Sequence, residues 1–376
     1  MRKGITTDAI STSSLHCQRY LRTISFSQNP EITRRVLRVL DLSSTAISTL
    51  PECVGKLKLL KVLNLSNTKI REVPDCVRRL KCLEYLDVSE CTSIQSVPDW
   101  IGDLKSLSYL NLKNCSKELT RNYLPKGISS LSSLKTLRSR AFPLPAEENE
   151  FLNVKDLGNL TNLHEIYFFL EDEGGLRSVE DGSLERLVKM RILCVGNGIL
   201  AREGDIEESN LPALPEKMNI MKDLQHLFLI RFSVPNWICS MGNLIELTFY
   251  DCSGYPSLET MPNLQSLWLV KDSRCRELPE KFGESGGFPK LVRLMINEFP
   301  LLEELPALEE GAMQRLEVLW IYNCPRVKKV PEGLDLLSRL KAIDVEQASG
   351  ELEERLKEGG EDWLKIKANN PNIEIS

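Results

Sequence analysis

Cysteine is the residue type in this 376-residue chain whose abundance first suggests chemistry, since eleven are present. Cysteines can form disulfides, bind zinc or act as nucleophiles, but the Cys-x-x-Cys spacing common in zinc sites does not occur. Cys53 and Cys76 instead recur 23 residues apart. Four others stand eight residues after the first leucine of a repeated apolar pattern, where two copies carry threonine: Cys91, Cys115, Cys252 and Cys324, with Thr45 and Thr68. We therefore expect reduced thiols that donate to loop carbonyls, and no metal site.

The other residues capable of catalysis form no recognisable group. His16, His164 and His226 are scattered, and none has a partner at metal-ligand spacing. The chain has no GxxxxGKS/T phosphate loop and no GxGxxG nucleotide fingerprint. Pairs of carboxylates are common, but they are expected by chance in acidic loops. The sequence predicts a protein that is not an enzyme and uses no cofactor.

Aromatic residues recur at outward-facing places of the same apolar pattern, Leu-x-x-Leu-x-Leu. In a strand, the residue between the second and third apolar positions points away from the core, as does the residue two places later. Large aromatic side chains at such places are typical of binding hot spots. The alternative is that long insertion loops fold over the rings and cover them internally. The predicted partner-binding residues are Tyr167, Phe169, Phe228, Tyr250, Trp268, Met295, Trp320 and Tyr322.

Charge is divided along the chain, although the formal net charge is only −5. Residues 1–140 contain 23 Lys and Arg against 12 Asp and Glu, whereas residues 141–376 contain 25 against 41. A basic end can dock an acidic protein surface through complementary potential, and solvated surface loops are the alternative. Nucleic acid fits poorly as a partner, because the basic half lacks interleaved aromatics. The residues predicted for docking are Arg34, Arg35, Arg38, Arg78, Arg79 and Lys81.

A repeat positions all of these residues. Leu-x-x-Leu-x-Leu occurs thirteen times from residue 37 onward, mostly at the 20–29-residue period typical of leucine-rich repeats. The predicted fold is an α/β leucine-rich-repeat solenoid, or horseshoe, with a parallel β-sheet on the concave face. Short helices, 3-10 turns and loops are expected on the convex face. Each outer turn is expected to start at a proline and to return one apolar residue to the core: Pro51 with Val54, Pro74 with Val77, Pro98 with Ile101, and Pro125 with Ile128.

The repeat also predicts the division of the chain. The expected segments are a flexible lead-in at 1–20, an N-terminal capping turn at 21–36, the solenoid at 37–350, and a C-terminal helical cap and tail at 351–376. The last strand is predicted at 340–345, followed by one amphipathic helix over 351–367. Polar insertions are expected to form loops on one face at 141–150, 171–183 and 196–215.

Targeting signals are not evident. The first 20 residues lack the apolar stretch of a secretory signal, and no apolar run is long enough to cross a bilayer. The sequence predicts a cytoplasmic protein without a membrane span.

Two stretches resemble one family. LRVLDLSSTAISTLP at residues 37–51 is close to an early repeat of plant nucleotide-binding leucine-rich-repeat immune receptors, the coiled-coil class especially. GGEDWLKIKANNPNIEIS at residues 359–376 looks like that family's terminus, with its Glu-Asp-Trp and later Pro-Asn-Ile. The resemblance implies recognition of a pathogen effector or a guarded host protein on the concave face. It also implies restraint of a nucleotide-binding domain, in cis or in trans, by the basic N-terminal repeats.

The chain departs from the family in lacking a phosphate loop and a Met-His-Asp motif. It is therefore expected to be the repeat domain alone, so nucleotide switching is not carried over. The alternative function is an intracellular repeat scaffold outside immunity that binds a small GTPase or another signalling protein. Repeats of such a scaffold would be nearly uniform at 23 residues, whereas these become irregular after residue 134.

Overall fold

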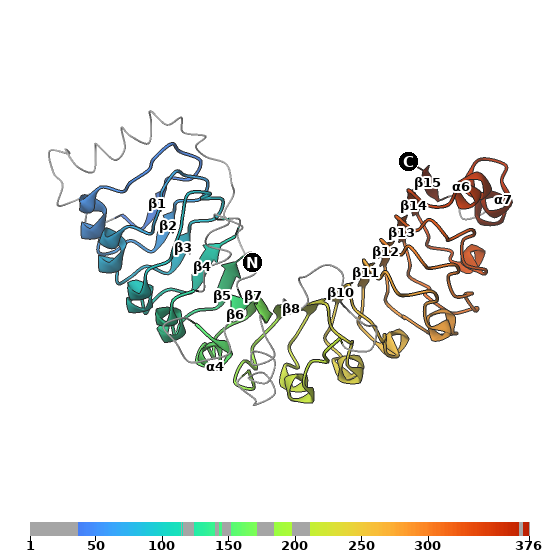
Figure 1. Ribbon diagram of the computed structural model, residues 1–376, viewed down its shortest axis with the longest axis horizontal. Helices are drawn as coiled ribbons and strands as arrows, with labels where there is room; N and C mark the ends of the chain where they lie inside the picture. The colour runs from blue at the N-terminus through green and yellow to red at the C-terminus, as the bar shows by residue number, and fades with distance from the viewer. Residues whose placement is uncertain are drawn as a thin grey trace. The chain divides into compact units, whose positions relative to one another are not determined.

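The structure is a computed structural model in which the chain forms two compact units, Met1–Tyr167 and Phe168–Ser376 (Figure 1). The predicted lead-in and capping turn lie outside the described residues, as do Arg34, Arg35, most of the three insertions and the side chain of Phe169. The residues described are 37–113, 115, 124–139, 143–144, 152–170, 184–197, 211–367 and 371–375.

One parallel strand per repeat builds the first unit. The alternation of apolar and polar residues turns one leucine of each strand inward, so Leu63 lies in register between Leu40 and Leu86 with none of its surface exposed. The strands are β1 (Val39–Asp41), β2 (Val62–Asn64), β3 (Tyr85–Asp87), β4 (Tyr109–Leu112), β5 (Thr136–Ser139) and β6 (Pro143–Leu144), with β7 (Glu165–Leu170) at the boundary between the units.

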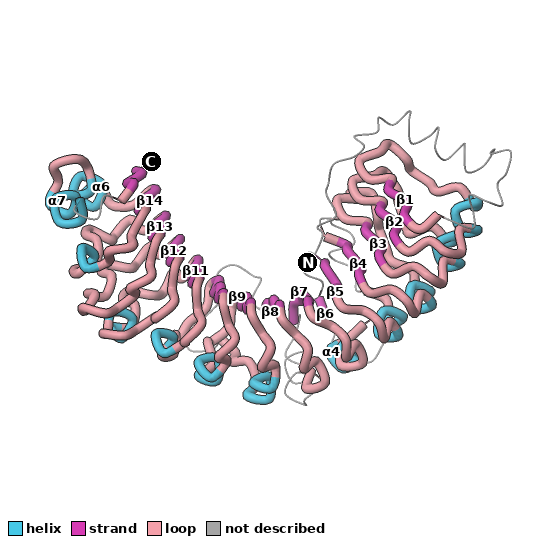
Figure 2. The backbone as a smooth tube through the Cα atoms, turned by 180° about the vertical axis from the view of Figure 1, so that it is seen from behind, coloured by secondary structure: helices cyan, strands magenta, loops and turns pink. Residues whose placement is uncertain are grey.

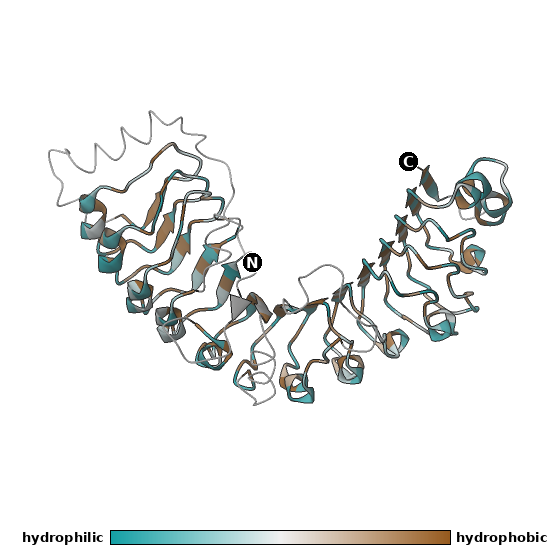
Figure 3. Cartoon of the chain, in the orientation of Figure 1, coloured by the Kyte–Doolittle hydropathy of each residue, from teal (hydrophilic) through white to brown (hydrophobic). Residues whose placement is uncertain are grey.

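The second unit continues the same construction. Its strands pair in parallel from β8 to β15, and Phe249, Leu269 and Ile296 are buried in register behind the sheet. Brown apolar residues alternate with teal polar ones along the chain (Figure 3). The strands are β8 (Ile192–Asn197), β9 (His226–Ile230), β10 (Glu246–Tyr250), β11 (Ser266–Val270), β12 (Arg293–Asn297), β13 (Val318–Tyr322), β14 (Ala342–Glu346) and β15 (Asn372–Ile375).

Short helices lie on the side of each turn away from the strands (Figure 2). Proline precedes most of them, because its fixed φ suits the start of a helix and its missing N–H leaves no donor unpaired there. Val54, Val77, Ile101 and Ile128 return to the core without exposed surface, as predicted. The 3-10 helices are η1 (Glu52–Lys56), η2 (Asp75–Arg79), η3 (Asp99–Asp103), η4 (Lys126–Ser130), η5 (Glu216–Ile220), η6 (Asn236–Ser240), η7 (Leu258–Thr260), η8 (Glu280–Gly283) and η9 (Leu334–Leu336), and one α-helix, α4, covers Val154–Leu157.

The predicted leucine-rich-repeat solenoid, with a parallel sheet on one face and short helices on the other, is therefore confirmed. In several turns a small Thr or Cys side chain closes the strand by bonding inward. Thr45 and Thr68 donate to the carbonyls of Leu42 and Leu65 at 2.6 and 2.7 Å, and the Cys91 thiol also reaches the Leu65 carbonyl at 3.1 Å. The expectation that this place holds buried thiols is confirmed for Cys91, Cys115, Cys252 and Cys324.

The C-terminal segment differs from the prediction of a single helix over 351–367. Two helices, α6 (Gly350–Leu356) and α7 (Glu361–Ile366), are separated by a turn at Gly359 and Gly360. Lys357 is extended and Gly359 has a φ of +88°, so the helix does not continue through this turn. A Cβ on Gly360 would lie 2.4 Å from the Arg355 carbonyl oxygen, so the turn requires glycine there. The last strand is β15, which pairs with β14, and not the predicted strand at 340–345.

Asp362 fastens this C-terminal segment to the preceding turn. Its carboxylate accepts hydrogen bonds from Arg355 Nε at 2.9 Å, from Arg355 Nη2 at 2.8 Å and from the backbone N–H of Val330 at 3.3 Å. Burial opposes ionisation, but the Arg355 bonds prevail and lower the pKa of Asp362 below its ordinary value. The Glu-Asp-Trp motif therefore has a structural role in joining α6, α7 and the loop before η9.

Candidate functional site

Six of the predicted partner-binding residues lie on neighbouring strands of the second unit. We call this group the aromatic face. Side chains at the outward places of a strand leave the sheet on one side, and parallel pairing sets Trp268 of β11 beside Met295 of β12, and Met295 beside Trp320 of β13. All six are half-buried. The aromatic face consists of Phe228, Tyr250, Trp268, Met295, Trp320 and Tyr322.

The two tryptophans of this face are stacked on each other. Their strands are two spacings apart, about 10 Å, which predicts rings separated by that distance. That expectation is wrong: the ring centroids are 5.4 Å apart with an interplanar angle of 19°. The long indole side chains lean together across the strand of Met295 and gain stacking energy, which strand spacing does not determine. Trp268 Nε1 is buried and has no hydrogen-bond partner among the described residues.

Polar groups flank the stacked rings. The Tyr322 hydroxyl donates to Asp344 Oδ2 on β14. Burial, followed by this hydrogen bond and the Asp344 charge, raises the pKa of Tyr322 well above its usual range, so the hydroxyl stays protonated. On the other side, the Lys271 ammonium lies 5.5 Å from the centroid of the Tyr250 ring. The face therefore combines apolar rings with oriented donors and acceptors.

Two predicted partner-binding residues precede this face in the chain. Tyr167 is half-buried and belongs to the first unit, and the side chain of Phe169 lies outside the described residues. The insertion loops that the alternative would place over the rings also lie largely outside the described residues.

A second aromatic pair, on the first unit, was missed from the sequence. Tyr85 of β3 and Tyr109 of β4 stack with centroids 4.3 Å apart and planes at 5°. Arg138 lies 5.9 Å from the Tyr109 ring centroid and makes a bidentate pair with Glu165, at 2.7 and 3.2 Å. The sequence does contain a signal for this pair, because Tyr85 and Tyr109 each stand two residues after the first leucine of their repeats, Leu83 and Leu107.

The predicted docking residues are partly engaged inside the first unit. Arg78 Nε lies 2.7 Å from Asp103 Oδ2, and Arg79 pairs with Glu52 at 3.0 Å. Lys81 Nζ donates to the backbone carbonyl of Asp103 at 3.4 Å. These three side chains remain exposed, and each also bonds to a residue of a neighbouring turn. Arg38 is exposed on the turn of β1.

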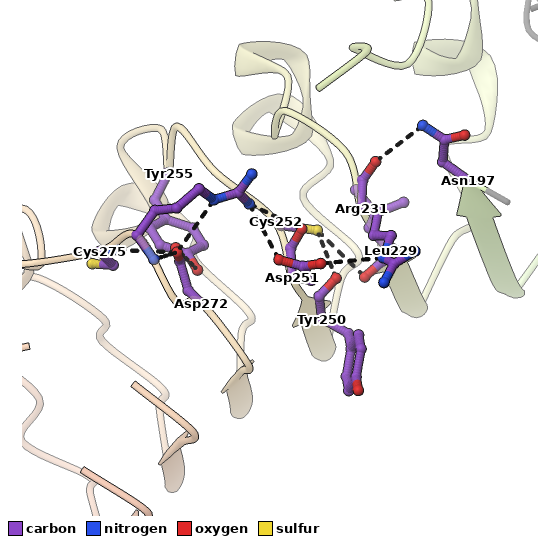
Figure 4. Close-up of polar contacts among 10 residues, drawn as sticks. Asn197, Leu229, Arg231, Tyr250, Asp251, Cys252, Tyr255, Asp272 and Cys275 are labelled. Carbon is purple, nitrogen blue, oxygen red and sulfur yellow. Dashed lines mark hydrogen bonds and ion pairs between the residues drawn. The ribbon is translucent and has the colours of Figure 1, made fainter. Parts of the chain in front are cut away.

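A ladder of charges follows the strand ends of the second unit (Figure 4). Arg231 Nε donates to Asp251 Oδ2 at 3.1 Å, and Arg274 Nη2 donates to Asp251 Oδ1 at 3.3 Å. Asp272, almost fully buried, accepts from the Tyr255 hydroxyl at 3.1 Å and from the N–H groups of Arg274 and Cys275. The ladder ties together the loops after β9, β10 and β11.

Nucleophilic chemistry is disfavoured at the described thiols. Burial raises the pKa of Cys194, Cys252 and Cys275 to about 12, so these thiols are protonated at neutral pH. The ten cysteines in the described ranges are free thiols. Within those ranges, no cluster of three or more His, Cys, Asp or Glu residues is arranged to hold a metal ion.

The sequence predicts no Gly-x-Ser-x-Gly nucleophile elbow, although one stretch matches the spacing. Residues 283–287 read Gly-Glu-Ser-Gly-Gly, and this pattern marks a nucleophile elbow only between a strand and a helix. Here it follows η8, and Ser285 Oγ donates to the Glu310 carbonyl at 2.6 Å. Ser285 therefore holds a turn and is not placed as a nucleophile.

No helix in the described parts of the chain is both long and apolar enough to cross a membrane.

Known structures share the fold. A leucine-rich-repeat protein of Leptospira interrogans aligns with a TM-score of 0.61 and 21% identity, covering 88% of this chain and 76% of its own. The plant peptide hormone receptor RGFR1, solved in complex with RGF2, aligns with a TM-score of 0.51 and 20% identity, covering 83% and 52%.

Curated relatives point to plant disease resistance proteins. A probable disease resistance protein of Arabidopsis thaliana is 28% identical over 65% of this chain, and disease resistance protein RPP8 of the same species is 27% identical over 63%. These alignments cover only 29% and 28% of the relatives' own lengths. The model of the family described as leucine-rich repeat region matches residues 23–373. The chain thus belongs to the leucine-rich repeat region family, and is a repeat region of the kind found in plant nucleotide-binding leucine-rich-repeat disease resistance proteins.

Proposed function

We propose that this chain is a protein-recognition module of plant innate immunity, and that the aromatic face binds a pathogen effector or a guarded host protein. The observation that carries the proposal is the stacked pair of Trp268 and Trp320, half-buried at outward places of β11 and β13. The disease resistance proteins among its relatives support the immune setting.

The physical argument concerns what the stacked rings offer a partner. Tryptophan and tyrosine give large contact areas with few rotatable bonds, so their ordering costs little entropy, and they dominate measured hot spots. The pair already has a fixed geometry, which lowers that cost further. The Tyr322 hydroxyl and Asp344 carboxylate at its margin supply polar groups that can select orientation.

Basic residues of the first unit complete the proposal. We infer that Arg38, Arg78, Arg79 and Lys81, with Arg34 and Arg35, dock and restrain a nucleotide-binding domain in cis or in trans. Two of them would keep their pairs with Asp103 and Glu52 while facing a partner, because an exposed ion pair is weak and easily shared. The setting that fits the free thiols is the reducing cytoplasm.

Recognition, and not catalysis, is what the described chemistry supports. Burial raises the pKa of Cys194 and Cys252 to about 12, which keeps these thiols protonated at neutral pH, and Ser285 bonds to a backbone carbonyl. The scaffold alternative is disfavoured by the uneven repeat, since β10 and β11 start 20 residues apart and β11 and β12 start 27 apart.

The test is a comparison of partner capture from plant tissue. The chain, its Trp320→Ala variant and its Trp100→Ala variant would serve as bait, and captured proteins would be identified and then titrated as purified proteins. Trp100 is the matched control, because it lies in η3 of the first unit and bonds to Asp75. The proposal expects a protein that the parent and Trp100→Ala bind and Trp320→Ala does not. Equal capture by all three baits would overturn it.

A further inference from the structure

A shallow groove lined by polar side chains and two prolines follows the strand ends of the second unit, beside the aromatic face. Loops after β11, β12, β13 and β14 border an open volume of about 540 Å³. The groove contains neither tryptophan of the stacked pair. Its lining residues are Lys271, Ser273, Glu298, Pro300, Asn323, Pro325 and Gln347.

The groove arises from a three-residue step that the repeat produces in each turn. The residue immediately after the strand takes a left-handed conformation, with φ of +57° at Lys271, +60° at Glu298, +52° at Asn323 and +49° at Gln347. The next residue turns inward, as the fully buried Phe299 does, and the third turns out again. Because Ser44, Asn67 and Glu90 share the conformation, it is a property of the repeat. It places one polar side chain per turn along a line.

Most polar side chains along this line have unused bonding capacity. Glu298, Ser273 and Gln347 are exposed, and the described residues give their side chains no hydrogen bond or ion pair. Asn323 Nδ2 donates to Asn297 at 2.9 Å, which leaves its own amide oxygen open. The Lys271 ammonium rests only against the Tyr250 ring. Side chains with unused donors and acceptors suit a ligand whose own hydrogen-bond donors and acceptors alternate along its length.

Hydrogen bonds within the chain fix one wall of the groove in the absence of a ligand. Lys271 and Ser273 flank Asp272, whose carboxylate bonds to Tyr255, Arg274 and Cys275 in the charge ladder (Figure 4). Arg274 is in turn anchored to Asp251. Binding to a wall that is already ordered loses less conformational entropy.

We propose that this groove binds an extended peptide segment with a basic side chain opposite Glu298, the acid among its lining residues. Four neighbouring loops span three strand spacings, about 14 Å, and an extended chain advances about 3.4 Å per residue, so about four residues fit. Amide side chains at Asn323 and Gln347 match peptide N–H and C=O groups, and the two proline rings offer a flat apolar floor. Glu298 is an exposed acid without a cationic partner among the described residues, which selects a basic side chain.

This inference goes beyond the proposed function, because it requires neither tryptophan of the aromatic face. The charge of the region favours the same ligand: residues 141–376 carry 41 acidic and 25 basic residues. Lys271 lies at the β11 end of the groove, where its positive charge would repel a basic side chain. The peptide's basic residue therefore belongs at the β12–β14 end.

The experiment uses the full chain and three fluorescein-labelled, end-blocked hexapeptides. They are identical except that two positions are lysine, glutamine or glutamate, and binding is followed by fluorescence anisotropy at low and at physiological salt. The proposal expects the lysine peptide to bind at least tenfold more tightly than the glutamine peptide. Glu298→Gln and Gln347→Ala should each weaken the lysine peptide about fivefold to tenfold.

Matched variants separate groove binding from general attraction to an acidic chain. Glu280→Gln removes the same charge from an exposed place in η8 and should leave lysine-peptide affinity unchanged. Trp320→Ala should also leave it unchanged, so failure of the proposed function would be seen separately. Equal weakening by Glu280→Gln and Glu298→Gln, an unaffected Gln347→Ala variant, or no preference for lysine would overturn the groove as a peptide site.

Discussion

Trp268 and Trp320 touch through stacked rings although a whole strand, β12, separates their backbones. The contact makes the two side chains one unit, so neither contributes independently to folding or to binding. The Trp268 Nε1 group is buried, and no residue that the structure describes accepts its hydrogen bond. A partner that contacts this face therefore meets a paired, preformed surface.

The tryptophan pair provides the first prediction. Trp268→Ala and Trp320→Ala should each weaken partner binding by about 2 kcal/mol or more. Each should destabilise the fold by only about 1 kcal/mol, the energy typical of one aromatic contact. Because the two rings contact each other, the double variant should lose less free energy of unfolding than the two single variants lose together. Denaturant midpoints measured beside affinities would test this, and a loss of about 3–5 kcal/mol of stability would indicate rings covered by loops.

Leu63 provides a test of the repeat register. It has no exposed surface and lies between Leu40 and Leu86, so Leu63→Asp would bury an unpaired carboxylate and cost about 4 kcal/mol or more. The control is Val39→Asp on β1, where the native side chain is 55% exposed, and it should change little. A thermal melt of Leu63→Asp that overlays the parent's would refute the register.

Asp362 predicts a pH dependence. Its folded-state pKa is lowered, so the carboxylate stabilises the fold fully above the pKa of the unfolded chain, about 3.9, and progressively less as pH falls through the folded value. Asp362→Asn should therefore cost about 2 kcal/mol near neutral pH, and the difference from the parent should shrink below about pH 4. Urea titrations between pH 3 and 7 would show it. A pH-independent difference would contradict the role of the charge.

Reversal of basic residues tests the docking proposal. A nucleotide-binding domain from a matching receptor should bind the chain in trans, with affinity that falls as salt rises. Changing Arg34, Arg35 and Arg38 to Glu should weaken this association and leave the circular dichroism spectrum unaltered. The control reverses Arg315, Lys328 and Arg339, three exposed basic residues of the second unit. If neither salt nor either charge reversal changed the affinity, the docking proposal would be wrong.

Asp272 tests the charge ladder. Asp272→Ala would leave the Tyr255 hydroxyl and two backbone N–H groups without their acceptor, at a cost of about 3 kcal/mol. It should also loosen the Lys271 wall and weaken the lysine peptide. Asp223→Ala, at an exposed place without such bonds, is the control for stability and affinity. Unchanged hydrogen exchange at Arg274 and Cys275 in the Asp272 variant would disprove the positioning role.

Spacing along the chain predicts what depends on backbone periodicity. The burial of Leu63, the return of Val54 to the core and the inward thiol of Cys91 all follow from place in the repeat, and the structure confirms each. The outward direction of Trp268 and Trp320 follows from the same alternation.

What the sequence did not predict depends on side-chain length or on single residues. The 5.4 Å stack follows from indole side chains leaning across a strand, and the Tyr85–Tyr109 pair forms at an earlier outward place of its strands. Asp272 stands where other turns carry Thr, Cys or Phe, so its bonds to Tyr255 belong to that turn alone. The break between α6 and α7 required recognising the backbone conformation of Gly359.

The in-register contacts of the first unit have a consequence for how such a chain can change length. Removing residues 60–82 would bring Leu86 beside Leu40, and the Cys91 thiol would find the Leu42 carbonyl in place of that of Leu65. The new junction would repeat contacts that already exist elsewhere in the unit. Unequal recombination between repeats can therefore delete or duplicate a whole turn without opening the core, and so alter the surface offered to partners while the fold persists.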